Sequence, residues 1–107
     1  MIMISIPMGN DPNWKQRYKE VKEKLEKRGY KIAPLHINKI FDKTPTIQYP
    51  VESIPLVMMG NSMYRMALCD TVYFCKGWRY APGCVIEHIA ADKYGLNTIY
   101  EEDEDEN

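Results

Sequence analysis

Short apolar runs alternate with segments of helical period along this chain. Four apolar runs predict β-strands, at residues 2–7, 30–35, 71–75 and 97–100. Three segments between them predict helices: one from Pro12, its first helical position, to Gly29, and two at residues 56–68 and 83–94. Asp11 is the expected N-cap of the first helix. The apolar stripe of that helix consists of Trp14, Tyr18, Val21 and Leu25.

This alternation of strands and helices predicts an α/β fold with a parallel sheet between two layers of helices. Right-handed crossovers favour a three-layer sandwich with four parallel strands in the order 2-1-3-4, which is Rossmann-like or flavodoxin-like. Ligands of such sheets bind beyond the carboxyl ends of the strands, where the winding reverses. Residues 7–13 and 76–83 flank that point, so the site is expected beside them. Residues 36–55 show no clear period and hold three prolines, which predicts a long functional or mobile loop.

Length and composition are those of one globular domain. The chain has 107 residues, of which 45% are hydrophobic and 27% charged, and this excludes a disordered chain. No apolar run approaches the roughly 20 residues of a membrane span. Residues 1–4 lack the basic flank of a signal peptide, so a cytoplasmic location is expected. Cys69, Cys75 and Cys84 lack the spacing of a metal site and predict buried, reduced thiols.

The formal net charge of −1 hides an uneven distribution of charge. Residues 101–106 are all acidic, which leaves 14 basic residues against 9 of the 15 acidic ones in residues 1–100. Residues 101–107 therefore predict a disordered, solvated tail after a single domain at residues 1–100, with folding back onto a basic surface as the alternative. The lysines of the first helix alternate with glutamates, which favours a solvated face over nucleic-acid binding.

Glu87 is the strongest candidate for chemistry. It falls in the second turn of a helix that leaves one of the loops at the expected site. Gly83 lies four residues before it and Ala91 four residues after it, on the same face of the helix. A carboxylate between two small residues has room for a ligand beside it. The alternative is an ordinary surface glutamate.

Further candidates each have a structural alternative. Asp70 precedes the third strand, where it serves more simply as a turn residue, and only a bend or a short strand would let it assist catalysis. The loop at residues 76–83, which begins Lys76-Gly77, offers Trp78 and Tyr80 for stacking on a base. Lys76 or Arg79 could meet a phosphate. The alternative is an exposed loop with an aromatic plug over the sheet edge. Met8-Gly9-Asn10 precedes a helix N-terminus, a position that suits an anion.

Six segments follow one another in an order that is typical of a known superfamily. They are Ile4-Ser5-Ile6-Pro7-Met8-Gly9, Cys69-Asp70-Thr71-Val72-Tyr73-Phe74, Gly77-Trp78, Gly83-Cys84-Val85-Ile86-Glu87-His88, Tyr94-Gly95 and Tyr100-Glu101. In this order they resemble the nucleoside 2-deoxyribosyltransferase-like superfamily, and within it a small branch of unknown function that is common in phage and prophage genomes. The best motif is Gly83-x-x-x-Glu87, which matches the segment that carries the catalytic glutamate in characterised members.

The resemblance implies an enzyme that cleaves the N-glycosidic bond of nucleosides or nucleoside 5'-monophosphates, as a hydrolase or a 2-deoxyribosyltransferase. Glu87 is then the nucleophile, and no metal or other cofactor is needed. The expected substrate-binding residues are Met8, Gly9, Asn10, Gly77, Trp78, Arg79 and Gly83. The alternative function is a non-catalytic protein that binds a nucleotide or a nucleotide-derived signal.

The expected partners are a small molecule and further copies of this chain, with no membrane partner and no nucleic acid. The helix at residues 56–68 presents a broad apolar face that a small sheet cannot cover. Its apolar residues are Leu56, Met59, Met63, Met66 and Ala67, with Val57 and Met58 beside them. This face predicts a homodimer or larger homo-oligomer. The resemblance implies the same, because members of the superfamily assemble as dimers or larger oligomers.

Overall fold

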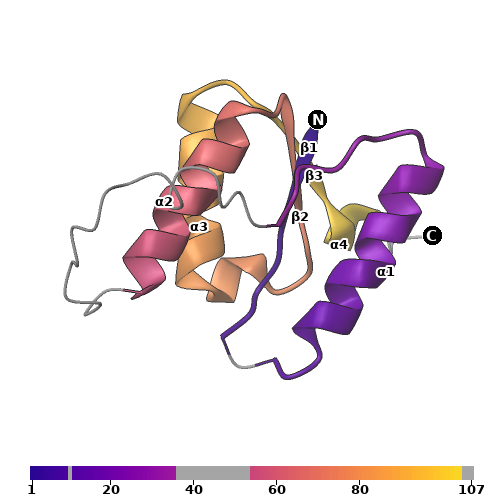
Figure 1. Ribbon diagram of the computed structural model, residues 1–107, viewed down its shortest axis with the longest axis horizontal. Coiled ribbons are helices and arrows are strands. Elements are labelled where there is room, and N and C mark those ends of the chain that lie inside the picture. Colours follow the sequence, from indigo (N-terminus) through magenta and orange to yellow (C-terminus); the bar gives the residue numbers. More distant parts are fainter. Residues whose placement is uncertain (10, 36–53, 105–107) are drawn as a thin grey trace, which may run out of the picture.

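The computed structural model describes residues 1–9, 11–35 and 54–104. At its centre lies a parallel sheet with the order β1-β2-β3, formed by β1 (Ile2–Ser5), β2 (Thr71–Phe74) and β3 (Asn97–Tyr100). The helices are α1 (Trp14–Lys27), α2 (Ile54–Ala67), η2 (Trp78–Tyr80, a 3-10 turn), α3 (Pro82–Lys93) and α4 (Glu101–Glu104). The ribbon places α1 on one side of the sheet and α2 with α3 on the other (Figure 1). The predicted α/β class with a parallel sheet is confirmed.

The second predicted strand is reduced to a single bridge, so the described sheet has three strands where four were predicted. Ile32 pairs with Ile2 in parallel. Ile2 N–H donates to the carbonyl of Lys31, and Ala33 N–H donates to the carbonyl of Ile2, both at 2.9 Å. The next residue is Pro34, which has no N–H to donate, and the pairing stops there.

The sheet separates two cores. Every residue of β1 and β2 is buried, as expected for strands covered on both faces. Ile4 packs with Leu25 in the core beneath α1, whereas Phe74 packs with Met66 and Cys84 in the core beneath α2 and α3. All three cysteines are buried free thiols, which confirms that prediction.

Helix α1 begins two residues later than predicted. The Asp11 carboxylate accepts a hydrogen bond from the backbone N–H of Asn13 at 2.8 Å, so Pro12 and Asn13 form a turn before the helix. The N-cap is therefore Asn13, which makes no side-chain capping bond. The predicted helix end at Gly29 is correct, and Gly29 (φ 93°) and Gly95 (φ 73°) both adopt the left-handed conformation, after α1 and α3 respectively.

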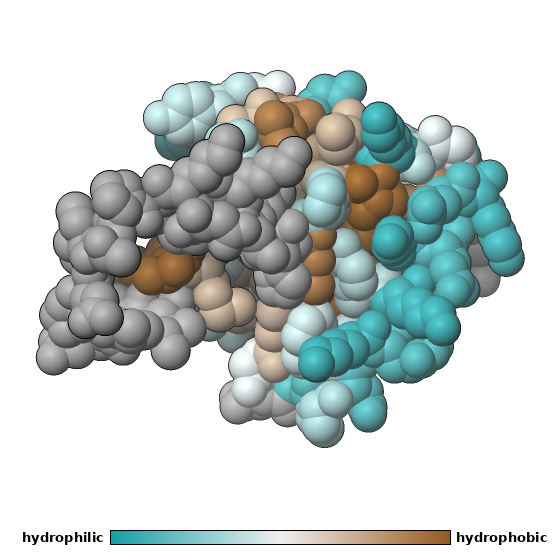
Figure 2. All heavy atoms as spheres, viewed as in Figure 1, coloured by the Kyte–Doolittle hydropathy of each residue, from teal (hydrophilic) through white to brown (hydrophobic). Residues whose placement is uncertain are grey.

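The outer surface reflects the charge pattern of the sequence. Hydrophilic residues gather over α1, on the right of the space-filling view (Figure 2). Within the described part of the chain, no helix has both the length and the apolar character that crossing a membrane requires. Of the long loop expected at residues 36–55, residues 36–53 lie outside the described residues, and the last two belong to α2.

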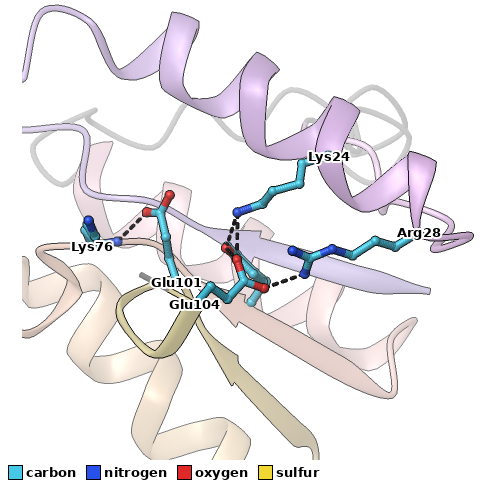
Figure 3. A network of polar contacts seen from close by, with 6 residues as sticks. Lys24, Arg28, Lys76, Glu101 and Glu104 are labelled. Carbon is cyan, nitrogen blue, oxygen red and sulfur yellow. Dashed lines mark hydrogen bonds and ion pairs between the residues drawn. The ribbon is translucent and has the colours of Figure 1, made fainter. Parts of the chain in front are cut away.

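The acidic segment is not a solvated tail over residues 101–104, which form α4 and fold back toward α1 (Figure 3). Glu104 accepts hydrogen bonds from Lys24 Nζ and from the Tyr73 hydroxyl, both at 2.8 Å, and pairs with Arg28. Burial raises the pKa of Glu104, but its bonds with Arg28, Lys24 and Tyr73 outweigh that effect and lower the pKa to about 2. The alternative of folding back on a basic surface is thus correct for these four residues; residues 105–107 lie outside the described residues.

Candidate functional site

Glu87 is the most buried acidic side chain of the described residues and the centre of a small polar cluster. It comes from the second turn of α3, and its exposed fraction is 8%. The alternative of an ordinary surface glutamate is therefore excluded. Gly83 lies one turn earlier and faces α2, because a Cβ at that position would be in ordinary van der Waals contact with the terminal methyl group of Met59, at 3.5 Å. The space expected beside Glu87 on the Gly83 side is thus bordered by α2.

Ser5 and Cys84 accompany Glu87 in this cluster. Ser5 is the last residue of β1 and is 1% exposed, so the cluster lies at the carboxyl end of that strand. Its hydroxyl makes a contribution that lowers the pKa of Glu87 and of Cys84, in opposition to the larger effect of burial. The Oγ atom makes no hydrogen bond of normal geometry with the described residues. Burial outweighs this effect at Cys84 and raises the pKa of the thiol to about 11, so the thiol is neutral.

The protonation of Glu87 is balanced near neutral pH. Burial raises its pKa to about 7, against the opposing effects of the positive charge of Arg65 and of the Ser5 hydroxyl. At pH 7 such a carboxyl group is divided between its ionised and protonated forms. It therefore has the properties of a nucleophile when ionised and of a proton donor when protonated.

Arg65 belongs to this cluster and was not among the predicted site residues. It comes from α2 and is 4% exposed. Its Nε donates to the carbonyl oxygen of Pro34 at 2.7 Å, whereas its Nη2 is buried and has no hydrogen-bond partner among the described residues. A signal was present in the sequence, because Arg65 is the one charged residue in the otherwise uncharged segment 54–67.

One family model matches this chain, over residues 1–100. The chain belongs to the family called Domain of unknown function (DUF4406). The match includes all of Ser5, Arg65, Cys84 and Glu87, so the polar cluster lies within the DUF4406 domain. No curated protein and no solved structure matches the chain.

Asp70 lies at the opposite end of the DUF4406 sheet from Glu87. It immediately precedes β2, at the amino end of the parallel strands, whereas Ser5 and Glu87 lie at the carboxyl end. Its carboxylate is 80% exposed, lies 4.0 Å from the amino terminus and accepts a hydrogen bond from the Thr71 hydroxyl at 3.1 Å. The structure therefore does not bring Asp70 together with Glu87, and its position agrees with the simpler role in a turn.

The loop after β2 buries Trp78 as an aromatic plug, whereas Tyr80 in the same loop is 92% exposed. Trp78 is 7% exposed and stacks on His88 with ring centroids 4.4 Å apart. Stacking on a base requires an exposed ring face, whereas the Trp78 ring is buried against His88. Arg79 forms an ion pair with Glu102 at 3.1 Å, and its guanidinium lies over the Trp78 ring. Gly77 (φ 86°) takes the left-handed conformation that starts the η2 turn.

The remaining predicted binding residues lie elsewhere. Met8 and Gly9 line an open hollow of about 560 Å³, and Asn10 lies outside the described residues. The other lining residues are Asp11, Pro12, Trp14 and Lys15. None of the polar cluster around Glu87 lines this hollow. Among the described residues, no group of three or more His, Cys, Asp and Glu side chains is arranged to hold a metal ion.

Proposed function

We propose that this DUF4406 domain is an N-glycoside hydrolase or 2-deoxyribosyltransferase that acts on nucleosides or nucleoside 5'-monophosphates, with Glu87 as the nucleophile. The observation that carries the proposal is the burial of the Glu87 carboxyl group beside Ser5 at the carboxyl end of β1. Ligands of parallel α/β sheets bind at this end of the strands. The resemblance to the nucleoside 2-deoxyribosyltransferase-like superfamily supplies the reaction class.

The proposed reaction is a double displacement with retention of configuration. The ionised Glu87 carboxylate attacks the anomeric carbon and forms a glycosyl ester, while the C–N bond breaks. The base leaves with the bonding electron pair and takes up a proton from solvent. In a hydrolase, water then attacks the same carbon, gives a proton to solvent and releases the Glu87 carboxylate; in a transferase, a second base does so.

Two groups of the cluster have roles in this scheme. The positive charge of Arg65 favours the ionised form of Glu87, which is the form that attacks. Developing positive charge on the sugar is stabilised by the same carboxylate in a site that holds little water. Ser5 contributes a hydroxyl at the base of the site.

One observation favours a second function, the binding of a nucleotide or a nucleotide-derived signal without cleavage. Asp70, the one other acidic residue proposed for catalysis, lies at the opposite end of the strands from Glu87. A ligand in the Glu87 site then lacks the second carboxylate with which glycoside-cleaving enzymes commonly assist the leaving group.

A screen of nucleosides and nucleoside 5'-monophosphates for release of free base separates the two functions. We expect the wild-type protein to release base from at least one of them, and Glu87→Gln to release it several orders of magnitude more slowly. Glu23→Gln, which removes an exposed carboxylate from α1, is the matched control and should retain full activity. Binding without release by the wild-type protein would favour the second function.

We further infer the predicted Rossmann-like order 2-1-3-4, with the residues around Ile32 as a shortened second strand. The parallel bridge between Ile32 and Ile2 on the free edge of β1 supports this assignment. We also infer a cytoplasmic location, which the three free, buried thiols support.

We infer in addition that the chain forms a homodimer or larger homo-oligomer through α2. Leu56, Val57 and Met58 are 67%, 51% and 49% exposed, although all three are large and apolar. An apolar groove of about 470 Å³ also lies beside the C-terminal end of α2, where Met63 and Tyr94 contribute to its walls. Exposed apolar surface of this kind is typical of contact surfaces between proteins.

A further inference from the structure

Arg65 is a buried cation, and among the described residues no side chain neutralises its charge by contact. Only 4% of the residue is exposed. Its one hydrogen bond with the described part of the chain goes to a neutral acceptor, the carbonyl oxygen of Pro34, at 2.7 Å. Nη2 is fully enclosed and donates to no described residue. A buried donor without a partner, on a charged group, is costly in a folded protein, so the arrangement calls for a functional explanation.

Those neighbours of Arg65 that the structure describes do not supply the missing anion. Its charge interacts with Tyr18, Glu87 and Cys69. Burial raises the pKa of the Tyr18 phenol and of the Cys69 thiol, so both groups are neutral at pH 7. Glu87 is partly protonated at that pH, and among the described ion pairs none joins it to Arg65.

We propose that Arg65 binds an anionic group of the ligand, a phosphate or a carboxylate, in the site that contains Glu87. The hydrogen bond from Nε to Pro34 fixes the plane of the guanidinium and leaves the Nη2 hydrogens for the ligand. A planar guanidinium suits the paired oxygens of phosphate and carboxylate groups. An anion held there neutralises Arg65 and places the rest of the ligand beside Glu87. This inference rests on the proposed function only in taking the Glu87 site as the ligand site.

The position differs from the anion sites that the sequence suggested. Arg79 is engaged by Glu102, and Gly9 belongs to the separate hollow before α1. If Arg65 holds the anion, the protein binds the charged form of a sugar more tightly than the uncharged form of the same sugar. Hydrogen bonds to a charged partner are worth enough to change affinity by about 10- to 100-fold.

Calorimetric titration with ribose 5-phosphate and with ribose tests this selection on the full chain. We expect the wild-type protein to bind ribose 5-phosphate about 10- to 100-fold more tightly than ribose. Arg65→Met should abolish the difference, Arg65→Lys should retain part of it, and Lys22→Met should retain all of it, since Lys22 is an exposed cation on α1. Competition by inorganic phosphate and by acetate shows which anion the site prefers.

A purely structural role for Arg65 predicts that its replacement destabilises the fold and leaves the preference for ribose 5-phosphate over ribose unchanged. Arg65→Met removes an unsatisfied buried charge and leaves a shorter, apolar side chain, although the carbonyl oxygen of Pro34 loses its donor, so the melting temperature should stay close to that of the wild type. Equal affinity for ribose 5-phosphate and ribose in the wild-type protein, or an unchanged preference in folded Arg65→Met, would overturn the proposal. If Arg65→Met does not fold, an undiminished preference in Arg65→Lys overturns it equally.

The outcome is separable from that of the proposed function. Glu87→Gln should lose base release and keep the preference for ribose 5-phosphate, because Arg65 is intact. A wild-type protein that prefers ribose 5-phosphate but never releases base would support the anion site at Arg65 and contradict the proposed enzymatic function. Base release without any preference for ribose 5-phosphate would support the enzymatic function and contradict the anion site.

Discussion

Replacing Glu87 by glutamine should stabilise the folded protein at pH 8 and change its stability much less at pH 5. Glutamine has the shape of the protonated carboxyl group but cannot ionise. In the wild-type protein the carboxyl group must lose its proton in a site that disfavours charge, because burial raises its pKa from 4.5 to about 7. The unfolded chain loses the same proton at the lower value.

The sign and the size of the effect follow from these two values. Between pH 4.5 and about 7 the folded state holds a proton that the unfolded state has released, so the free energy of unfolding falls as the pH rises. Each pH unit of difference in pKa corresponds to about 1.4 kcal/mol, which gives a total of about 3 kcal/mol. Most of this decrease in the free energy of unfolding falls between pH 5 and pH 8. It does not occur in Glu87→Gln, because glutamine does not ionise. The total is a large part of the about 5–15 kcal/mol that typically stabilises a domain.

Urea unfolding followed by circular dichroism measures the effect directly. The difference in unfolding free energy between Glu87→Gln and the wild type should grow by about 2–3 kcal/mol from pH 5 to pH 8. Glu23→Gln controls for the loss of any carboxylate and should show no such growth, because Glu23 is exposed on α1. A difference for Glu87→Gln that is the same at both pH values would refute the inference that Glu87 ionises in a buried site.

Three further predictions concern the rate of cleavage, α4 and assembly. Base release should increase as the pH rises through about 7, because ionised Glu87 is the attacking form, and a rate that falls over this range in a pH series would contradict that role. Glu104→Ala should lower the unfolding free energy by about 2 kcal/mol, since it removes the partner of three donors, whereas exposed Asp103→Asn should cost little in the same urea titration. Leu56→Glu should convert the oligomer to monomer in sedimentation velocity without lowering the melting temperature, and a wild-type protein that is monomeric at micromolar concentration would remove the proposed interface.

The local elements were predictable from the sequence because each is encoded over a few neighbouring residues. The apolar stripe of α1 and the glycines after α1 and α3 act within one or two turns, and the structure agrees with them. The sequence also located Glu87, because its helix starts from a loop at the carboxyl end of a strand. Pro34 gave a signal as well, since a residue without an N–H cannot continue a strand pairing, but the run at residues 30–35 was predicted as a full strand.

The rest depends on contacts between distant parts of the chain. Glu104 meets Lys24 across 80 residues, and no local pattern in an acidic segment indicates which cation lies opposite. Arg65 interrupts an apolar helix, but whether such a residue is exposed or buried is decided by what packs against α2. Trp78 lies in a loop whose composition is typical of a binding loop. Its place in the core follows from its stacking on His88, which comes from α3.

Mass spectrometry of the protein during turnover detects a covalent glycosyl ester at Glu87. A nucleoside that the screen identifies as a substrate is mixed with the wild-type protein, the mixture is quenched in acid, and the peptides are mapped. We expect one glycosyl group esterified to the peptide at Glu87, and in Glu87→Gln no such adduct and base release that is several orders of magnitude slower. Base release at an undiminished rate by Glu87→Gln, or an adduct on any other residue, would contradict the role of Glu87 as the nucleophile.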